Sequence, residues 1–118
     1  MLPGSARSSF RILRAGEATL VFPEGARTLD GNLQPAEPGL GLVIAKTLAP
    51  VVPMRIFGAH EAWPRGSSKI RLHPITIVVG DPIFFSETDI AGRGKEMYQR
   101  LSERVMNEIA KLTIDGND

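Results

Sequence analysis

The amino-acid sequence predicts an α/β fold in which helices flank a mixed sheet. Two β-rich runs, 18–22 and 51–57, enclose a helical pattern at 38–48, and this order is typical of a βαβ unit. Further β-branched residues and a long amphipathic helix follow. A chain of 118 residues is too short to fill two hydrophobic cores, so residues 1–118 are expected to form one domain.

The first elements are short. Residues 7–15 mix helix-forming and apolar residues, and Gly16 is of the type that commonly ends a helix, so a short helix, or the end of a longer one, is expected there. Residues 18–22 form a run that stops at Pro23, which favours a buried strand over a helix. Residues 26–38 have the composition of turns and loops.

The middle of the chain begins with Pro38, which suits the first position of a helix that ends before the next proline. Residues 51–57 form the second β-rich run. Pro53 lacks an amide donor, and therefore places this strand at a sheet edge or beside a bulge. Residues 58–68 are predicted to be a loop, and residues 69–79 one or two further strands.

The C-terminal part contains the clearest helical pattern. Ser86 and Asp89 have the spacing of a capping box for a separate turn of helix, which Gly92 and Gly94 interrupt before the last helix. The helix that follows should pack on the sheet through one apolar stripe: Met97, Leu101, Val105, Ile109 and Leu112. Two oppositely charged pairs are expected on its exposed side: Glu96 with Arg100, and Arg104 with Glu108. The tail 115–118 should fray.

Composition and motifs exclude several function classes. Fourteen Lys and Arg residues against thirteen Asp and Glu residues leave a net charge of +1, so recruitment of nucleic acid by bulk charge is not expected. The absence of cysteine excludes thiolate nucleophiles and Cys-bound zinc, and fits a reducing compartment. His60 and His73 fit no zinc protease spacing and are expected to be surface or packed residues, and no nucleotide-binding loop occurs. No metal or bound cofactor is therefore expected.

The residues that could carry chemistry follow the first predicted strand: Phe22, Pro23, Glu24, Gly25, Ala26, Arg27 and Thr28. Ligands of open α/β sheets gather beyond the carboxyl ends of strands. Arg27 could hold a phosphate through paired hydrogen bonds, and Glu24 could accept hydrogen bonds from ligand hydroxyls or fix Arg27. The alternative is a surface turn with an ion pair contributing about 0–1 kcal/mol, and the residues taken alone favour that alternative.

The order of residues in this stretch favours a binding site over a surface turn. It resembles the Phe-Pro-Glu-Gly-Thr-Arg-Ser block of the PlsC-like lysophosphatidate acyltransferases, in the glycerolipid acyltransferase family, with Ala26 for Thr and Thr28 for Ser. Residues 50–54, followed by Gly58, are similar to the fourth block of that family, and residues 80–83 before the last helix are similar to its ending. The resemblance runs from about residue 12 to residue 112 and implies a glycerol-3-phosphate acyltransferase-like fold.

The resemblance also implies an activity and its partners. A fatty acyl group would move from acyl-CoA or acyl carrier protein to the hydroxyl of lysophosphatidate or a related glycerophospholipid, in the cytoplasm or at the cytoplasmic face of a membrane. Arg27 would hold the acceptor phosphate, and Glu24 would bind its glycerol part or orient the site. Gly25 would allow close backbone approach, and Phe22, Pro23 and Thr28 complete the substrate-binding stretch.

One part of the family pattern is not found in this chain. The resemblance implies a His and an Asp, separated by four residues, upstream of the block, with the His deprotonating the acceptor hydroxyl. Here His60 is followed five positions on by Arg65, and both histidines lie downstream of the block. The chain therefore resembles the C-terminal part of such an enzyme, truncated at its N-terminus, with no catalytic residue of its own and no expected turnover alone. The alternative is a non-catalytic phospholipid-binding or structural module.

Overall fold

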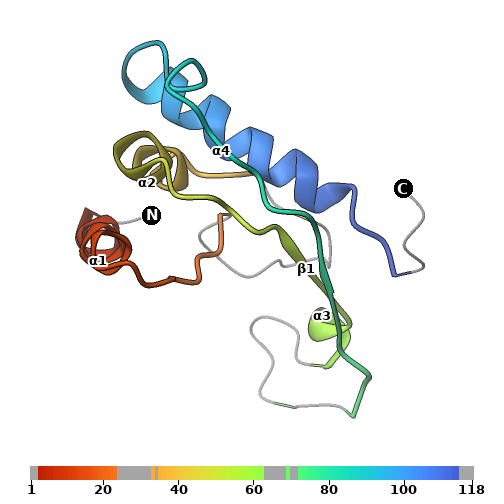
Figure 1. The fold of residues 1–118 in the computed structure, drawn as a ribbon. Helices are drawn as coiled ribbons and strands as arrows, with labels where there is room; N and C mark the ends of the chain where they lie inside the picture. Colours follow the sequence, from red (N-terminus) through yellow and green to blue (C-terminus); the bar gives the residue numbers. More distant parts are fainter. Residues whose placement is uncertain (1–2, 24–32, 34, 63–68, 70–71, 115–118) are drawn as a thin grey trace.

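The computed structural model describes residues 3–23, 33, 35–62, 69 and 72–114. The four helices of this part of the chain are α1 (Pro3–Arg14), α2 (Gly39–Thr47), the short α3 (Ala59–Ala62) and α4 (Gly94–Ala110). Its two strands are β1 (Met54–Phe57) and β2 (Thr76–Val79). Figure 1 shows α4 as the longest element, running beside the strands, with α1 and α2 together towards one end.

The core lies mainly between α2 and α4. The predicted stripe of α4 is confirmed, because Met97, Leu101, Val105 and Ile109 are all buried. The buried core residues come from both helices and from the segments before them: Ala36, Leu40, Ile44, Ile83, Phe85, Met97, Leu101, Val105, Met106 and Ile109. The apolar periodicity of α4 therefore faces another helix more than it faces the sheet.

The seam between α2 and α4 depends on two small residues. Ser102 is completely buried, and its hydroxyl accepts a hydrogen bond of 2.8 Å from the amide of Gly41. A first-turn helix amide has no partner within its own helix, so Ser102 satisfies a donor that burial would otherwise leave unpaired. A Cβ atom on Gly41 would overlap the Tyr98 carbonyl, so only glycine permits this approach of the two backbones.

The sheet is antiparallel, with Met54 opposite Val79 and Ile56 opposite Ile77. Pairing continues beyond the strands through a 2.8 Å hydrogen bond from the Gly80 amide to the Pro53 carbonyl and a bridge between Val51 and Ile83. The predicted strand at 51–57 is shorter than expected, because β1 begins directly after Pro53, which lacks an amide donor.

Arg55 ties the sheet to the end of α4. Its Nη1 donates to the carbonyls of Ala110, at 3.0 Å, and Leu112, at 3.2 Å, and its guanidinium also lies over the ring of Phe57. Carbonyls at a helix C-terminus lack intrahelical partners and carry partial negative charge, so a cation is favourable there. This face of the sheet is thereby held against α4.

The turn before α4 confirms the predicted cap and corrects the predicted ion pairs. Asp89 accepts hydrogen bonds from the amide of Ser86, at 2.8 Å, and from its hydroxyl, at 3.1 Å. Arg104 pairs with Asp89 at 3.3 Å and not with Glu108, because the turn brings this carboxylate over the helix. The hydrogen bonds from Ser86 lower the pKa of Asp89 below its ordinary value of 3.8, and the positive charge of Arg104 lowers it further.

The other predicted pair, Glu96 with Arg100, is wrong for a related reason. Arg100 donates from Nη2 to the carbonyls of Asp89 and Ala91, at 3.2 and 3.0 Å, and so does not need Glu96 as a partner. Glu108 pairs with Lys111 at 3.2 Å. The segment that crosses the start of α4 offers acceptors that sequence spacing along one helix cannot reveal.

Other local predictions had mixed outcomes. The first helix ends as expected, with Gly16 at a φ of 83°. The predicted buried strand at 18–22 is wrong: these residues form no strand, and Leu20 and Phe22 are 68% and 62% exposed. A strand needs a neighbour to complete its hydrogen bonds, and no described segment pairs with this run. The predicted parallel βαβ pair is likewise not seen among the described residues. The predicted loop at 58–68 contains α3 at its start.

Candidate functional site

A backbone hydrogen bond joins the two ends of the segment that contains the predicted substrate-binding stretch. The carbonyl of Pro23 accepts a 2.8 Å hydrogen bond from the amide of Glu37, so the chain leaves at Pro23 and returns beside it. Val21 before this bond and Leu33 within the segment are partly buried against the core. The two ends of the segment between Pro23 and Glu37 are therefore fixed to the body of the molecule.

Phe22 and Pro23 are the two predicted site residues that the structure describes. The side chain of Phe22 is largely exposed, and Pro23 is half-buried. Glu24, Gly25, Arg27 and Thr28 lie outside the described residues, so the predicted pairing of carboxylate and guanidinium stays a prediction.

Helix α2 starts directly after this segment, with Pro38 in helical conformation before Gly39. The exposed amides at a helix start attract anions in many proteins. Here one first-turn amide, that of Gly41, is already bonded to Ser102, and no acidic residue occupies the first turn. One amide at the start of α2 therefore binds α4 and is not available to an anion.

The two histidines have separate environments. The buried Nδ1 of His60, on α3, has no hydrogen-bond partner, and neither imidazole is paired with a carboxylate within the described part of the chain. The exposed His73 places Nδ1 2.9 Å from the Pro74 carbonyl. Because a carbonyl can only accept, Nδ1 must carry the proton in this contact, which leaves Nε2 of the neutral ring as an acceptor.

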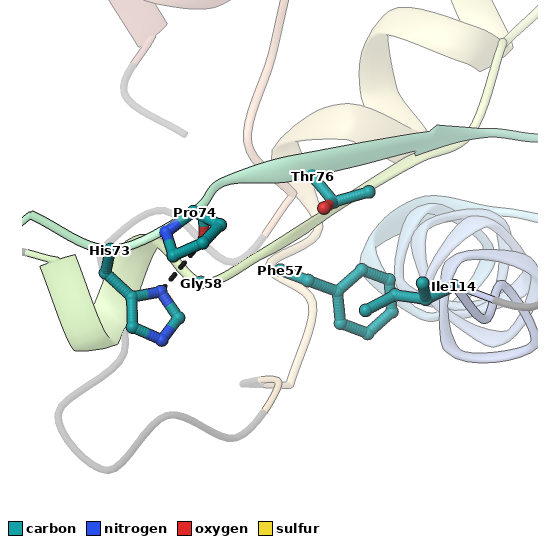
Figure 2. Close-up of a pocket in the computed structure, with 6 residues that line it drawn as sticks. All are labelled: Phe57, Gly58, His73, Pro74, Thr76 and Ile114. Atoms are coloured by element: carbon teal, nitrogen blue, oxygen red, sulfur yellow. Dashed lines mark hydrogen bonds between the residues drawn. The ribbon is translucent and has the colours of Figure 1, made fainter.

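His73 lines a pocket of about 340 Å³ with residues from three separate segments: Phe57, Gly58, His73, Pro74, Thr76 and Ile114. Figure 2 shows the His73 ring on one side of it and the side chains of Phe57 and Ile114 close together on the other. Gly58 has a φ of 93°, and a Cβ there would overlap the Pro74 carbonyl, so this close approach requires glycine.

This pocket is mainly apolar, with the Thr76 hydroxyl and the His73 ring as its polar groups, and it contains none of the predicted site residues. Sequence reasoning missed it because its members are scattered along the chain. The one available signal was Gly58, a glycine that directly follows a β-rich run.

No group of three or more potential metal-ligating side chains occurs among the residues that the structure describes. Across those same residues, no helix combines the length and apolar character needed to cross a bilayer.

Comparison with known proteins gives consistent matches. The family model named Acyltransferase matches residues 4–57. A chloroplastic 1-acyl-sn-glycerol-3-phosphate acyltransferase, BAT2, from Brassica napus is 35% identical over 80 residues, which are 67% of this chain and 23% of the relative. The 1-acyl-sn-glycerol-3-phosphate acyltransferase of Limnanthes douglasii has the same identity over 80 residues, which are 28% of its length. The chain thus spans about a quarter of the length of these relatives.

A solved structure has the same fold. The 1-acyl-sn-glycerophosphate acyltransferase PlsC from Thermotoga maritima superposes with a TM-score of 0.68 at 22% identity, and the match covers 92% of this chain and 45% of that one. The expectation of a PlsC-like α/β fold, present in part, is confirmed by this match. The match to residues 4–57 and the 35% identical relatives show that the chain is similar in sequence to glycerolipid acyltransferases, and the superposition shows that it has the PlsC-like fold in part.

Proposed function

We propose that this chain supplies the acceptor-binding part of an enzyme that moves a fatty acyl group to the hydroxyl of lysophosphatidate. The observation that carries the proposal is the Phe-Pro-Glu-Gly-Ala-Arg-Thr stretch at 22–28, which lies inside the segment matched by the Acyltransferase model. The names of the 35% identical relatives support the same acceptor class.

The reaction requires a defined set of bond changes. The acceptor hydroxyl attacks the carbonyl of an acyl thioester, the C–O ester bond forms, the C–S bond breaks, and the hydroxyl proton passes to a base. The thiol of coenzyme A or of acyl carrier protein leaves. This chain's part is to position the acceptor, at the cytoplasmic face of a membrane where such lipids reside.

Arg27 is proposed as the phosphate ligand. A guanidinium binds phosphate oxygens through two parallel charge-assisted hydrogen bonds, and an ammonium cannot reproduce this geometry. Glu24, three residues earlier, would accept hydrogen bonds from the glycerol part or hold Arg27 in place. The hydrogen bond from Glu37 to Pro23 supports the proposal, because it fixes the base of the segment that carries both residues.

Binding of lysophosphatidate to Arg27 variants tests this assignment. Arg27→Ala should weaken binding, measured by calorimetry or fluorescence, by about 10-fold to 100-fold, the loss of a hydrogen bond to a charged group. Arg27→Lys should recover part of the affinity. The matched control is Arg93→Ala, because Arg93 is an exposed arginine in another part of the chain. Equal binding by Arg27→Ala and Arg93→Ala would remove Arg27 from the site.

A second candidate is a phospholipid-binding module without catalysis. In it, Arg27 binds the phosphate of the lipid and no acyl group is transferred. Binding that depends on Arg27, with no acyl transfer even after the rest of the family fold is supplied, would support this second function.

A further inference from the structure

A side chain of α4 holds the end of the segment that carries the predicted binding stretch. Nε2 of Gln99 donates a 2.8 Å hydrogen bond to the carbonyl of Ala36. Ala36 is buried, and the next residue is Glu37, whose amide bonds to the Pro23 carbonyl. Residues 35–37, which lead from the segment towards α2, are called the return limb below. Gln99 therefore connects α4 to the return limb, directly beside the bond that joins the two ends of the segment.

The amide group of Gln99 is oriented by a second contact. Its Nε2 also donates to Oε1 of Glu103, further along α4, at 3.2 Å. A backbone carbonyl and a carboxylate can only accept hydrogen bonds, and only the nitrogen end of a glutamine amide donates. Both neighbours thus require the same orientation of the amide. The Gln99 side chain is set to hold Ala36 before any ligand binds.

Gln99 differs from the other polar residues of α4 in what it holds. Ser102 bonds to the start of α2, and Arg100 bonds to the turn before α4. Gln99 is half-buried and is not a member of the hydrophobic core. Loss of its amide should therefore loosen the return limb while the packing of α2 against α4 stays in place.

We propose that Gln99 is a positioning residue for acceptor binding, which acts through the return limb and does not itself contact the acceptor. The inference rests on the proposed function, because it takes Glu24 and Arg27 as the groups that bind the acceptor. A segment whose ends are already fixed loses less conformational freedom when a ligand binds, and this preorganisation raises affinity. Without the Gln99 bond, part of that ordering takes place during binding, and the affinity falls.

Two substitutions separate the N–H donor from the rest of the Gln99 side chain. Gln99→Met keeps a long side chain with good helix propensity but removes the donor. Gln99→Lys restores a donor that is long enough to reach the Ala36 carbonyl and can also pair with Glu103. The matched control is Asn107→Met, which exchanges an amide for methionine at an exposed position further along the same helix.

Each variant is measured in two ways: by hydrogen exchange of the Glu37 amide and by affinity for lysophosphatidate. In Gln99→Met the Glu37 amide should exchange about 3-fold to 10-fold faster, because the return limb opens more often. The amide of Val105, a buried residue of α4, should keep its rate. The affinity should fall by about 3-fold to 10-fold, the loss of one hydrogen bond.

Gln99→Lys should recover most of both losses, and Asn107→Met should match the wild type in both measurements. A role confined to overall stability would shift the urea midpoint of Gln99→Met and leave its affinity under native conditions unchanged.

Arg27→Ala, measured in the same series, distinguishes failure of this proposal from failure of the proposed function. Weaker binding by Arg27→Ala together with unchanged binding by Gln99→Met would overturn the role of Gln99 and leave the proposed function in place. Equal losses in Gln99→Met and Gln99→Lys, or a lower affinity without faster exchange at Glu37, would also overturn that role. Unchanged binding by Arg27→Ala would overturn the proposed function itself, and the role of Gln99 in binding would fall with it.

Discussion

Ser102 and Gly41 show how single residues set the contact between the two main helices. The side chain of Ser102 is fully buried, and its hydroxyl accepts the hydrogen bond of the Gly41 amide. Removing the hydroxyl leaves a buried donor without a partner, which costs more than the loss of an ordinary exposed hydrogen bond.

Ser102→Ala should therefore reduce the free energy of unfolding by about 1–3 kcal/mol, measured by urea denaturation. Asn107→Ala, on the exposed side of the same helix, is the control and should stay within about 0.5 kcal/mol of the wild type. Equal stability of the two variants would mean that the Gly41 amide finds another acceptor.

Asp89 gives a residue-scale prediction about pH. Its pKa is lowered in the folded state, so it contributes stability above its unfolded pKa and loses this contribution as the pH falls through the folded value. The difference in urea midpoint between the wild type and Asp89→Asn should be present at neutral pH and should shrink below about pH 3.8. A difference independent of pH would assign the effect of the substitution to packing instead.

At the scale of elements, the close approach of α2 and α4 limits what position 41 can hold. Gly41→Ala improves intrinsic helix propensity by up to about 1 kcal/mol, but the new Cβ would overlap the Tyr98 backbone. Overpacking of this kind costs about 1–3 kcal/mol, and backbone atoms cannot rotate away as a side chain can.

The net effect of Gly41→Ala should therefore be destabilising by about 1–2 kcal/mol in thermal or urea unfolding. Lys46→Ala makes a helix substitution at an exposed position of α2 and should leave stability nearly unchanged. A stabilised Gly41→Ala variant would show that the helices can separate without penalty.

The elements also show what sequence patterns can predict. Helix α4, the end of α1 at Gly16 and the Ser86 cap follow from local rules, and the structure confirms them. The run at 18–22 fails because a strand is defined by its partner, which lies elsewhere. The predicted partner of Arg104 also fails, because Asp89 lies on a separate segment, and packing sets the distance between the two segments. Of the candidate site, the sequence supplies residue types and order, while the geometry of Glu24 and Arg27 is untested.

At the scale of the whole molecule, an acceptor-binding part without a general base should not turn over. Loss of a positioned base typically lowers the rate by about 10²-fold to 10⁴-fold. In an assay with acyl-CoA or acyl carrier protein thioesters and lysophosphatidate, this chain alone should release thiol no faster than a blank reaction, with the Thermotoga maritima enzyme as positive control. Robust turnover would mean that the base is present in this chain, and His73, which lines the pocket beside Phe57, would be the first residue to substitute.

The hydrogen bond between the Glu37 amide and the Pro23 carbonyl has a consequence for engineering. The thirteen residues between them start and finish at one hydrogen bond, and Leu33 and Ala36 near their end pack against the core, so the length of the part before Leu33 can change without moving the helices. Relatives that prefer different lipids could exchange this cassette as one unit. In such chimeras the transplanted segment would determine which acceptor is preferred. The melting temperature would stay that of the protein that receives the segment.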